Sequence, residues 1–450
     1  MNHIIKLLFC PLLLLVSFMA NAQCGQNCCI WAGAVTKQNI ADNPQYYHHF
    51  TDQQLRLDFI FGGDAKSQNI YLSGLKKEAI WGGTRRNLIP DFKYGEYRLE
   101  VVDKEYNKIL YSTGFNTLFQ EWRTTEEAKS TTRAFKSSCR IPYPRNNVKV
   151  AIYERMRDNG EYSKLAEFDI DPQDKAINGD IENNFPVVEI LNNGHPQNKV
   201  DLVFVAEGYT AQQMEKFRSD VQKHIGYLFE MEPYKHRQTD FNIWAVETVS
   251  AESGTDIPHH DIWKQTVANS NFYTFKTDRY LTASDHTLLC KLTSNVPCDA
   301  IYVIVNTDKY GGGGIYNFYG LSMSDHATTP MVFVHEFGHS FAGLADEYFY
   351  ESEDSFTDMY NTAIEPWEAN ITSLVEFEKK WKDMLPENTT IPTPVKKGEE
   401  QVLGVYEGGG YMTKGIYRPV DNCRMRTNHA PGFCPVCQRA IEKMIDYYCK

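Results

Sequence analysis

Polar and apolar residues alternate along the first third of the chain. Leu55, Leu57, Phe59 and Phe61 occupy every second position up to a turn at residues 62–64, as in a strand with one buried face. The same alternation predicts strands over 97–102, 108–112, 148–153 and 165–170, with turn-rich stretches between them. Residues 23–175 are therefore predicted to form an antiparallel β-sandwich.

The pattern changes after residue 185. Residues 200–206 form a continuous apolar run, as in a strand that is buried on both faces. A capping box at 210–213 precedes apolar residues that recur at helical intervals over 214–228. Further strands are predicted at 241–249 and 300–306. The chain is therefore predicted to be a multidomain α+β protein, with an α/β domain over residues 176–450.

Composition and charge narrow the possible partners and compartments. The 450 residues carry a formal net charge of −12, which argues against a nucleic-acid partner. Residues 1–22 have the plan of a secretory signal, with Lys6, an apolar stretch at 7–19 and cleavage after Ala22. The mature protein is predicted to be secreted or periplasmic. The alternative is an outer-surface lipoprotein anchored at Cys24, which the preceding glutamine disfavours. No later stretch of the sequence is predicted to form a transmembrane segment.

The cysteines agree with export. Ten of the 11 cysteines remain after signal cleavage, an even number that allows disulfides in an oxidising compartment. Cys290 and Cys298 flank a short loop and could pair, as could some of Cys423, Cys434, Cys437 and Cys449. For Cys434-Pro-Val-Cys437 a structural disulfide is favoured over redox or structural-zinc chemistry, because no second such motif accompanies it.

One stretch of the sequence carries recognisable chemistry. Thr329 can cap a helix and Pro330 suits the first helical position. In that helix His335 and His339 lie one turn apart on the same face, so both imidazoles can bind one zinc ion. Glu336, beside the first histidine, can take a proton from a water that attacks a carbonyl. The predicted cofactor is one catalytic Zn²⁺.

The third protein ligand of this zinc has several candidates. Gly343 allows the chain to turn sharply after the helix and to bring Asp346 back towards the metal. Asp346 is the predicted ligand, and Glu347 is the neighbouring alternative. A further alternative is a distant glutamate on a following helix, such as Glu365 or Glu368.

With these residues the sequence resembles the metzincin clan and, within it, the IgA peptidase family of bacterial zinc metallopeptidases. The matching segments are VFVAEGYT at 203–210, HEFGHSFAGLADEY at 335–348 and FCPVC at 433–437. The clan places its glycine three residues and its third ligand six residues after the second histidine, whereas this chain has four and seven. The resemblance implies that residues 176–450 form a metzincin-like catalytic domain and residues 23–175 an accessory domain.

The resemblance also implies further roles. Met425 corresponds to the methionine of the turn beneath the zinc. A strand within residues 310–319, containing the glycines at 311–314, would lie above the active-site helix and pair with an extended substrate. A glycine loop without substrate contact is the alternative. Tyr348 and Tyr417 are both candidates for a hydrogen bond to the developing oxyanion.

These inferences converge on a secreted zinc-dependent endopeptidase with Glu336 as general base. Its partner is a protein or peptide substrate whose identity the motifs do not specify, and cleavage of immunoglobulin A is not implied. The alternative function is a host-protein or glycan binding protein with a vestigial peptidase domain. That alternative predicts that His335 and His339 bind no zinc.

Overall fold

The computed structural model of the chain describes residues 44–350 and 359–450. The predicted secretory signal at 1–22 and Cys24 lie outside these ranges. A short helix, α2 (Pro44–His49), precedes the first strand.

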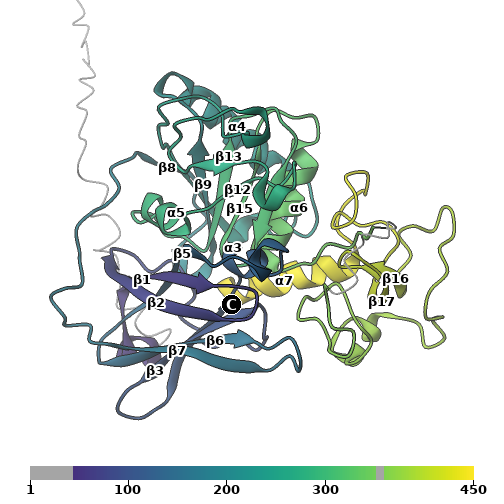
Figure 1. Cartoon of the computed structure of the whole chain (residues 1–450), viewed down its shortest axis with the longest axis horizontal. Coiled ribbons are helices and arrows are strands. Elements are labelled where there is room, and N and C mark those ends of the chain that lie inside the picture. The colour runs from purple at the N-terminus through teal and green to yellow at the C-terminus, as the bar shows by residue number, and fades with distance from the viewer. Residues whose placement is uncertain (1–43, 351–358) are drawn as a thin grey trace, which may run out of the picture.

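Two antiparallel sheets make up the first part of the described chain (Figure 1). One has the order β2 (Gln68–Glu78), β1 (Phe50–Gly63), β5 (Arg133–Pro144), and the other the order β4 (Ile109–Phe115), β3 (Tyr97–Asp103), β6 (Val148–Arg155), β7 (Tyr162–Ile170). The alternating residues Leu55, Leu57, Phe59 and Phe61 of β1 are fully buried and share one hydrophobic cluster with residues of the second sheet. The predicted alternation and the β-rich character of this region are confirmed.

The opposite face of the first sheet packs against the rest of the molecule. Ser138 of β5 donates its backbone N–H to His286 Nδ1 at 3.2 Å, and Arg140 donates to the carbonyl of Cys290 at 2.7 Å. His286 and Cys290 belong to helix α5 (His286–Leu292). Polar residues on this face of the sheet therefore serve as contacts between two parts of the fold instead of facing water.

The second part is organised around a six-stranded mixed sheet. Its order is β14 (Gly312–Ile315), β15 (Tyr319–Met323), β13 (Ala300–Val305), β9 (Val200–Glu207), β10 (Phe241–Val246), β8 (Val187–Leu191). The four central strands are parallel, and the edge strands β14 and β8 are antiparallel to their neighbours. Every residue of β9 is buried, as the continuous apolar run predicted.

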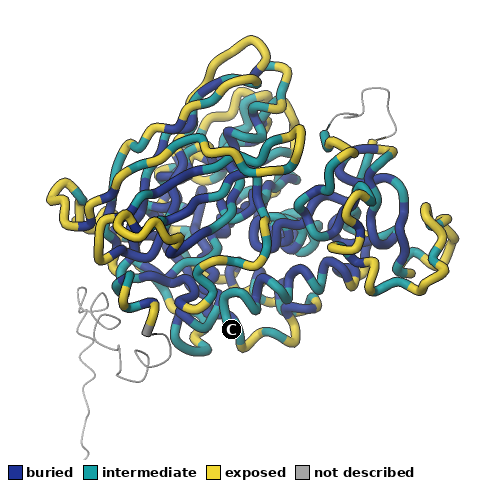
Figure 2. Tube along the Cα trace, turned by 90° about the horizontal axis from the view of Figure 1, so that it is seen from below, coloured by how far each residue is buried: buried dark blue, intermediate teal, exposed yellow. Residues whose placement is uncertain are grey.

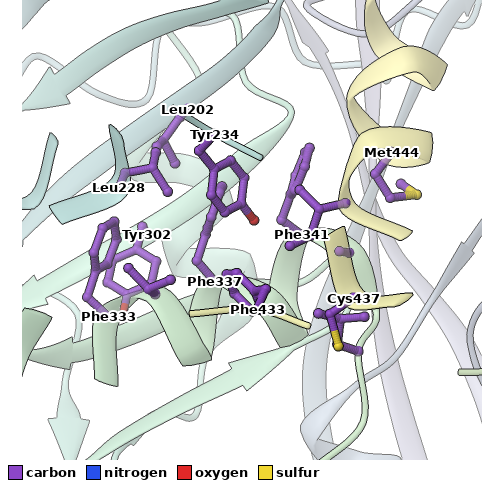
Figure 3. Packing of buried hydrophobic residues seen from close by; sticks show 14 of the residues in the cluster. Leu202, Leu228, Tyr234, Tyr302, Phe333, Phe337, Phe341, Phe433, Cys437 and Met444 are labelled. Atoms are coloured by element: carbon purple, nitrogen blue, oxygen red, sulfur yellow. The ribbon is translucent and has the colours of Figure 1, made fainter. Parts of the chain in front are cut away.

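Helices cover both faces of this sheet. Leu202, Phe204 and Ala206 of β9 face α4 (Met214–Phe229), α6 (Thr329–Ala342) and α7 (Pro435–Cys449) in one hydrophobic cluster. Val203 and Val205 face the opposite cluster, which includes α5. Figure 3 shows residues of the first cluster, including three aromatic side chains of α6. The predicted mixture of strands and helices in this part of the chain is confirmed.

The C-terminal part extends to one side of the sheets. It contains the hairpin β16 (Tyr406–Gly409) and β17 (Met412–Arg418) and several short turns. Trp381 is fully buried there and donates its indole N–H to the carbonyl of Gly404 at 2.8 Å. Helix α7 runs from this part back to the β-rich region, where Asn87 donates to the carbonyl of Tyr447 (Figure 1). Buried residues continue from the sheets into this part (Figure 2).

The other helices and strands of the described residues are short. The remaining α-helix is α3 (Leu118–Trp122), and β11 (Ser270–Asn271) pairs with β12 (Thr282–Ala283). The 3-10 helices are Glu127–Lys129, Pro196–Asn198, Ala211–Gln213, Gln238–Asp240, Pro258–His260, Thr274–Lys276, Phe377–Lys379 and Lys382–Met384. Among the described residues, none of the helices has the length and apolar character needed to span a bilayer.

The predicted disulfides are wrong for the part of the chain that the structure describes. Its seven cysteines, at positions 139, 290, 298, 423, 434, 437 and 449, are all free thiols. Helix α5 directs Cys290 towards His286, one turn earlier, with Sγ 3.5 Å from Nε2, instead of towards Cys298. Cys434 and Cys437 lie beside Cys423 and Glu347 and do not bond to each other.

The packing of α6 gives a first prediction. Phe337 is fully buried, and its ring centroid lies 5.1 Å from that of Phe341 and 5.6 Å from that of Tyr234. Phe337→Ala is expected to lower the free energy of unfolding by about 3–5 kcal/mol, because the cavity cannot fully collapse. Urea unfolding followed by fluorescence measures it. Tyr106→Ala, at a site 74% exposed, is the control and should change stability by less than about 0.5 kcal/mol. Equally small losses of stability in the two variants would contradict the close packing of Phe337.

Candidate active site

Helix α6 positions the central residues of the motif. It begins at Thr329, with Thr328 in the N-cap position, so the predicted cap is one residue too late. The Thr329 hydroxyl instead accepts the backbone N–H of His326 at 3.1 Å. The helix ends at Gly343, whose φ of +63° is left-handed, and this confirms the predicted turn. A Cβ at Gly343 would lie 2.8 Å from the ring of Trp367, so space as well as conformation requires glycine there.

Three side chains meet at one point beside this helix. The Nε2 atoms of His335 and His339 lie 3.0 Å apart, and Asp346 Oδ1 lies 3.1 Å and 3.2 Å from them. Tetrahedral ligands at about 2.0–2.1 Å from zinc would be separated by roughly 3.3 Å. The three donor atoms therefore have a spacing that fits one such ion, with a fourth position open.

The other nitrogen of each imidazole is held by the backbone. His335 Nδ1 donates to the carbonyl of Arg424 at 3.0 Å, and His339 Nδ1 donates to the carbonyl of Leu344 at 2.6 Å. These bonds fix the ring orientations and leave both Nε2 lone pairs directed at the shared point. Such supporting bonds are typical of histidines that bind metals.

Asp346 is held from its other side by a residue that sequence reasoning missed. The hydroxyl of Tyr411 donates a short hydrogen bond to Asp346 Oδ2. Tyr411 lies in the turn of the β16–β17 hairpin, where the N–H of Gly410 donates to the carbonyl of Asp346 at 2.8 Å. The hairpin therefore fixes both the backbone and the carboxylate of Asp346. No local signal around Tyr411 indicates this contact, because 65 residues separate the two.

The alternatives for the third ligand lie elsewhere in the fold. Glu347 points away from the histidines and contacts Asn370 and Cys437. Glu368 accepts a hydrogen bond from Tyr360 at 2.9 Å, and Glu365 accepts one from Ser373 at 3.2 Å. Among the carboxylates considered from the sequence, only Asp346 shares a potential metal-binding group with the two histidines in the described residues.

Glu336 directly follows His335 on α6 and lies against a glycine-rich strand. A Cβ at Gly312 of β14 would lie 2.9 Å from Glu336 Oε1, and one at Gly314 would lie 2.3 Å from the Glu336 carbonyl. Only glycines allow the strand to approach this closely. Burial raises the pKa of Glu336, while the nearby His335 and His339 lower it. A carboxylate whose pKa is raised towards neutrality is suited to accept and return a proton.

The predicted strand over the glycines forms, but its outer side is partly covered. Tyr280 makes a parallel β-bridge with Gly312, and the N–H of Leu281 donates to the Gly312 carbonyl at 3.3 Å. A Cβ at Gly313 would lie 2.6 Å from the carbonyl oxygen of Leu281. Residues 280–281 therefore occupy hydrogen-bonding positions along β14 that were predicted to pair with the substrate.

Met425 lies beneath the helix. It is fully buried, and a Cβ at Gly338 would come within 2.9 Å of its sulfur. The preceding residue, Arg424, supplies the carbonyl that accepts from His335, and the Met425 carbonyl accepts the N–H of Glu347 at 2.8 Å. The turn around Met425 thus supports a histidine and the segment that follows Asp346.

The two tyrosines considered for oxyanion binding have different positions. Tyr348 stacks edge-on against Tyr411 at 5.2 Å, and Arg279 donates to its hydroxyl at 3.4 Å, so it lies at the site. Tyr417 lies on β17, where its backbone pairs with that of Thr372. Arg279 was not predicted from the sequence.

A buried carboxylate dominates the electrostatics of the two histidines. Burial alone would lower the pKa of His339, but the Asp346 carboxylate outweighs it and raises that pKa to about 9. Glu121, on α3 from the β-rich region, has its pKa raised to about 7, chiefly by burial, while a hydrogen bond from Tyr280 opposes the shift. Glu121 interacts electrostatically with His339, Glu336 and Asp346, so carboxylates from two parts of the chain act on the site.

Comparison with known families covers most of the described chain. A family model described as IgA Peptidase M64 matches residues 188–402 and 398–445. A second model, described as Peptidase M64 N-terminus, matches residues 45–165. Comparison of the sequence with curated proteins gave no match.

The position of Glu368 predicts a pH-dependent stability. Burial raises the pKa of this carboxyl from 4.5 to about 7. Because the folded-state pKa is the higher one, the stabilising contribution is complete below 4.5 and is lost as the pH rises through about 7. Glu368→Gln, which stays neutral, should be more stable than wild type at pH 8, by at most about 3 kcal/mol, and the advantage should vanish near pH 4.

Calorimetric melting temperatures of wild type and Glu368→Gln, measured between pH 4 and pH 8, test this difference in stability. Glu387→Gln, at an exposed position, is the matched control and should follow wild type at every pH. A Glu368→Gln curve parallel to that of wild type would show that the carboxyl titrates normally.

Proposed function

The chain belongs to the IgA peptidase M64 family, and from that membership we propose that it is a secreted zinc-dependent endopeptidase. Membership makes it a peptidase of a metallopeptidase family, whose substrates are proteins or peptides. The proposal adds the metal, the residues that act and the compartment. Export is inferred from the apolar leader at residues 7–19 and the cleavage site at Ala22.

The observation that carries the proposal is the convergence of His335, His339 and Asp346 on one point, with Glu336 on the same helix. Two neutral imidazoles and one carboxylate match the donor set of catalytic zinc sites, which keep one position open. When bound there, zinc supplies Lewis acidity that activates water and polarises a carbonyl. In this proposal Tyr411 and the carbonyls of Arg424 and Leu344 hold the three donors in place.

Glu336 is proposed as the general base and acid. Its carboxylate takes the proton of the attacking water and then passes it to the leaving amine, so that no free amide anion has to form. Its half-buried position beside β14 raises the pKa of the carboxyl by desolvation. Arg279 and Tyr348 are proposed to contact the substrate carbonyl or its flanking backbone, because both lie beside Tyr411 at the site.

Glu336→Gln is the direct test of the chemistry. The variant should keep its zinc and lose a factor of roughly 10²–10⁴ in kcat, because the amide cannot carry the proton. Cleavage of a mixed peptide library, read by mass spectrometry, measures turnover, and elemental analysis measures zinc. Glu387→Gln, at an exposed position, is the control variant. The peptidase proposal fails if wild type cleaves nothing under varied conditions and binds no metal through His335 and His339.

Asp346→Ala tests the third ligand. It should lose one equivalent of zinc relative to wild type at micromolar free zinc, together with activity, because two imidazoles alone leave the ion undercoordinated. Glu368→Gln is the comparison and should retain the full zinc content. Full zinc and full activity in Asp346→Ala would mean that another carboxylate completes the site.

A further inference from the structure

A second cluster of metal-binding side chains lies behind the candidate active site. It consists of Cys423, Cys434, Cys437 and Glu347, all fully buried or nearly so, with one donor atom of each within 4.8 Å of the others. Cys434 is the N-cap residue of α7, and Cys437 is in its first turn. Figure 3 shows Cys437 at the end of the hydrophobic cluster near α7. Four potential ligands in an otherwise apolar region require a physical explanation.

The distances fit a shared ion better than a covalent bond. The sulfur atoms of Cys423 and Cys437 lie 3.7 Å apart. Zinc–sulfur bonds of about 2.3 Å in a tetrahedron place two sulfurs roughly 3.8 Å apart. A disulfide requires about 2.05 Å. Glu347 Oε1 lies 3.2 Å from Cys437 Sγ, slightly less than the roughly 3.5 Å expected for an oxygen and a sulfur on one zinc ion.

Glu347 lacks a complete set of partners. Its Oε1 accepts from Asn370 Nδ2 at 3.0 Å, but its buried Oε2 has no hydrogen-bond partner among the described residues. A buried carboxylate is costly unless a cation or a full set of donors compensates it. The nearby Arg418 uses its terminal nitrogens on the carbonyls of Glu407 and Gly408 and on Asp421.

We propose that Cys423, Cys434, Cys437 and Glu347 bind a second, structural zinc ion. Three thiolates and one carboxylate complete a tetrahedral shell with no open position, which is the arrangement of structural rather than catalytic sites. Thiolates also select zinc over the hard cations magnesium and calcium. The positive end of the α7 dipole stabilises the thiolate of Cys437 and its neighbour Cys434.

This ion would connect the two segments that hold the catalytic donors. Glu347 directly follows Asp346, and its N–H donates to the carbonyl of Met425. Cys423 lies just before Arg424, whose carbonyl holds His335. Both segments are otherwise loops, so a shared ion fixes them relative to α6 and to the first turn of α7. The second ion therefore stabilises the geometry of the active site without contacting substrate.

The rival is a disulfide. Pairing any two of the three cysteines would leave the third thiol buried beside Glu347, with no cation to compensate the carboxylate. A disulfide and a three-thiolate zinc site predict different thiol counts and different metal contents. Both quantities can be measured on the full-length protein.

Elemental analysis of protein purified without reductant is the first measurement. Wild type should hold about two zinc ions per chain. The double variant His335→Ala/His339→Ala should keep one, held by the cysteines. Cys437→Ser should also fall to one or fewer, whereas Cys449→Ser, at the other end of α7, should keep two. Two zinc ions in Cys437→Ser, or one in wild type that the histidine variant loses, would overturn the proposal.

A second measurement uses only wild type, so it does not depend on whether the cysteine variants fold. Titration with a mercurial thiol reagent in the presence of a zinc indicator should release one equivalent of zinc as Cys423, Cys434 and Cys437 react. Alkylation in denaturant and chelator, followed by peptide mass spectrometry, should find all three residues modified. A peptide pair joined by a disulfide among them, or release of a different metal, would overturn the proposal. In the first measurement, the zinc content of the histidine variant separates loss of this ion from failure of the catalytic site.

Discussion

The orientation of α6 is the constraint on which the rest of the site depends. Phe333, Phe337 and Phe341 recur every four residues and are buried in the cluster between this helix and the sheet. His335 and His339 are also four residues apart, so the same period that buries the rings holds both imidazoles together on another face. Rotation of the helix about its axis would expose the rings and bury the imidazoles. The hydrophobic effect thus determines where the chemistry can occur.

The parts of the fold and site that depend on local pattern could be predicted from the sequence. The alternation in β1, the apolar run in β9 and the spacing of His335, Glu336 and His339 each involve residues that are neighbours within one element. Gly343 is equally local, since a left-handed helix end depends on a single residue. Asp346 lies only three residues after Gly343, so its return towards the two histidines could also be predicted from that turn. The N-cap of α6 is Thr328, one residue before the predicted position, because Thr328 and Thr329 are adjacent residues that can both cap a helix.

The rest of the site depends on contacts between distant segments. Tyr411 reaches Asp346 from a hairpin 65 residues away, and Glu121 comes from the β-rich region to meet Tyr280. Residues 280–281 lie along β14. They belong to a long loop without a strong hydrophobic periodicity, so the sequence pattern could not predict this position. The cysteines illustrate the same limit. An even count suggested pairs, whereas the fold gathers three of them around a carboxylate, and only tertiary structure specifies that grouping.

The proximity of this cysteine cluster to the histidines affects how inhibition of the enzyme should be interpreted. Cys423 lies two residues from Met425, and Glu347 directly follows Asp346, so damage to the cluster would displace residues that support the catalytic group. Alkylating agents, oxidants and soft toxic metals would then abolish the proposed activity although Cys423, Cys434 and Cys437 are not part of the proposed catalytic group. An inhibitor profile of that kind normally assigns a protease to the cysteine class. Under the two proposed metal sites that assignment would be wrong for this protein, because the cysteine cluster shares its loops with the residues that hold His335 and Asp346.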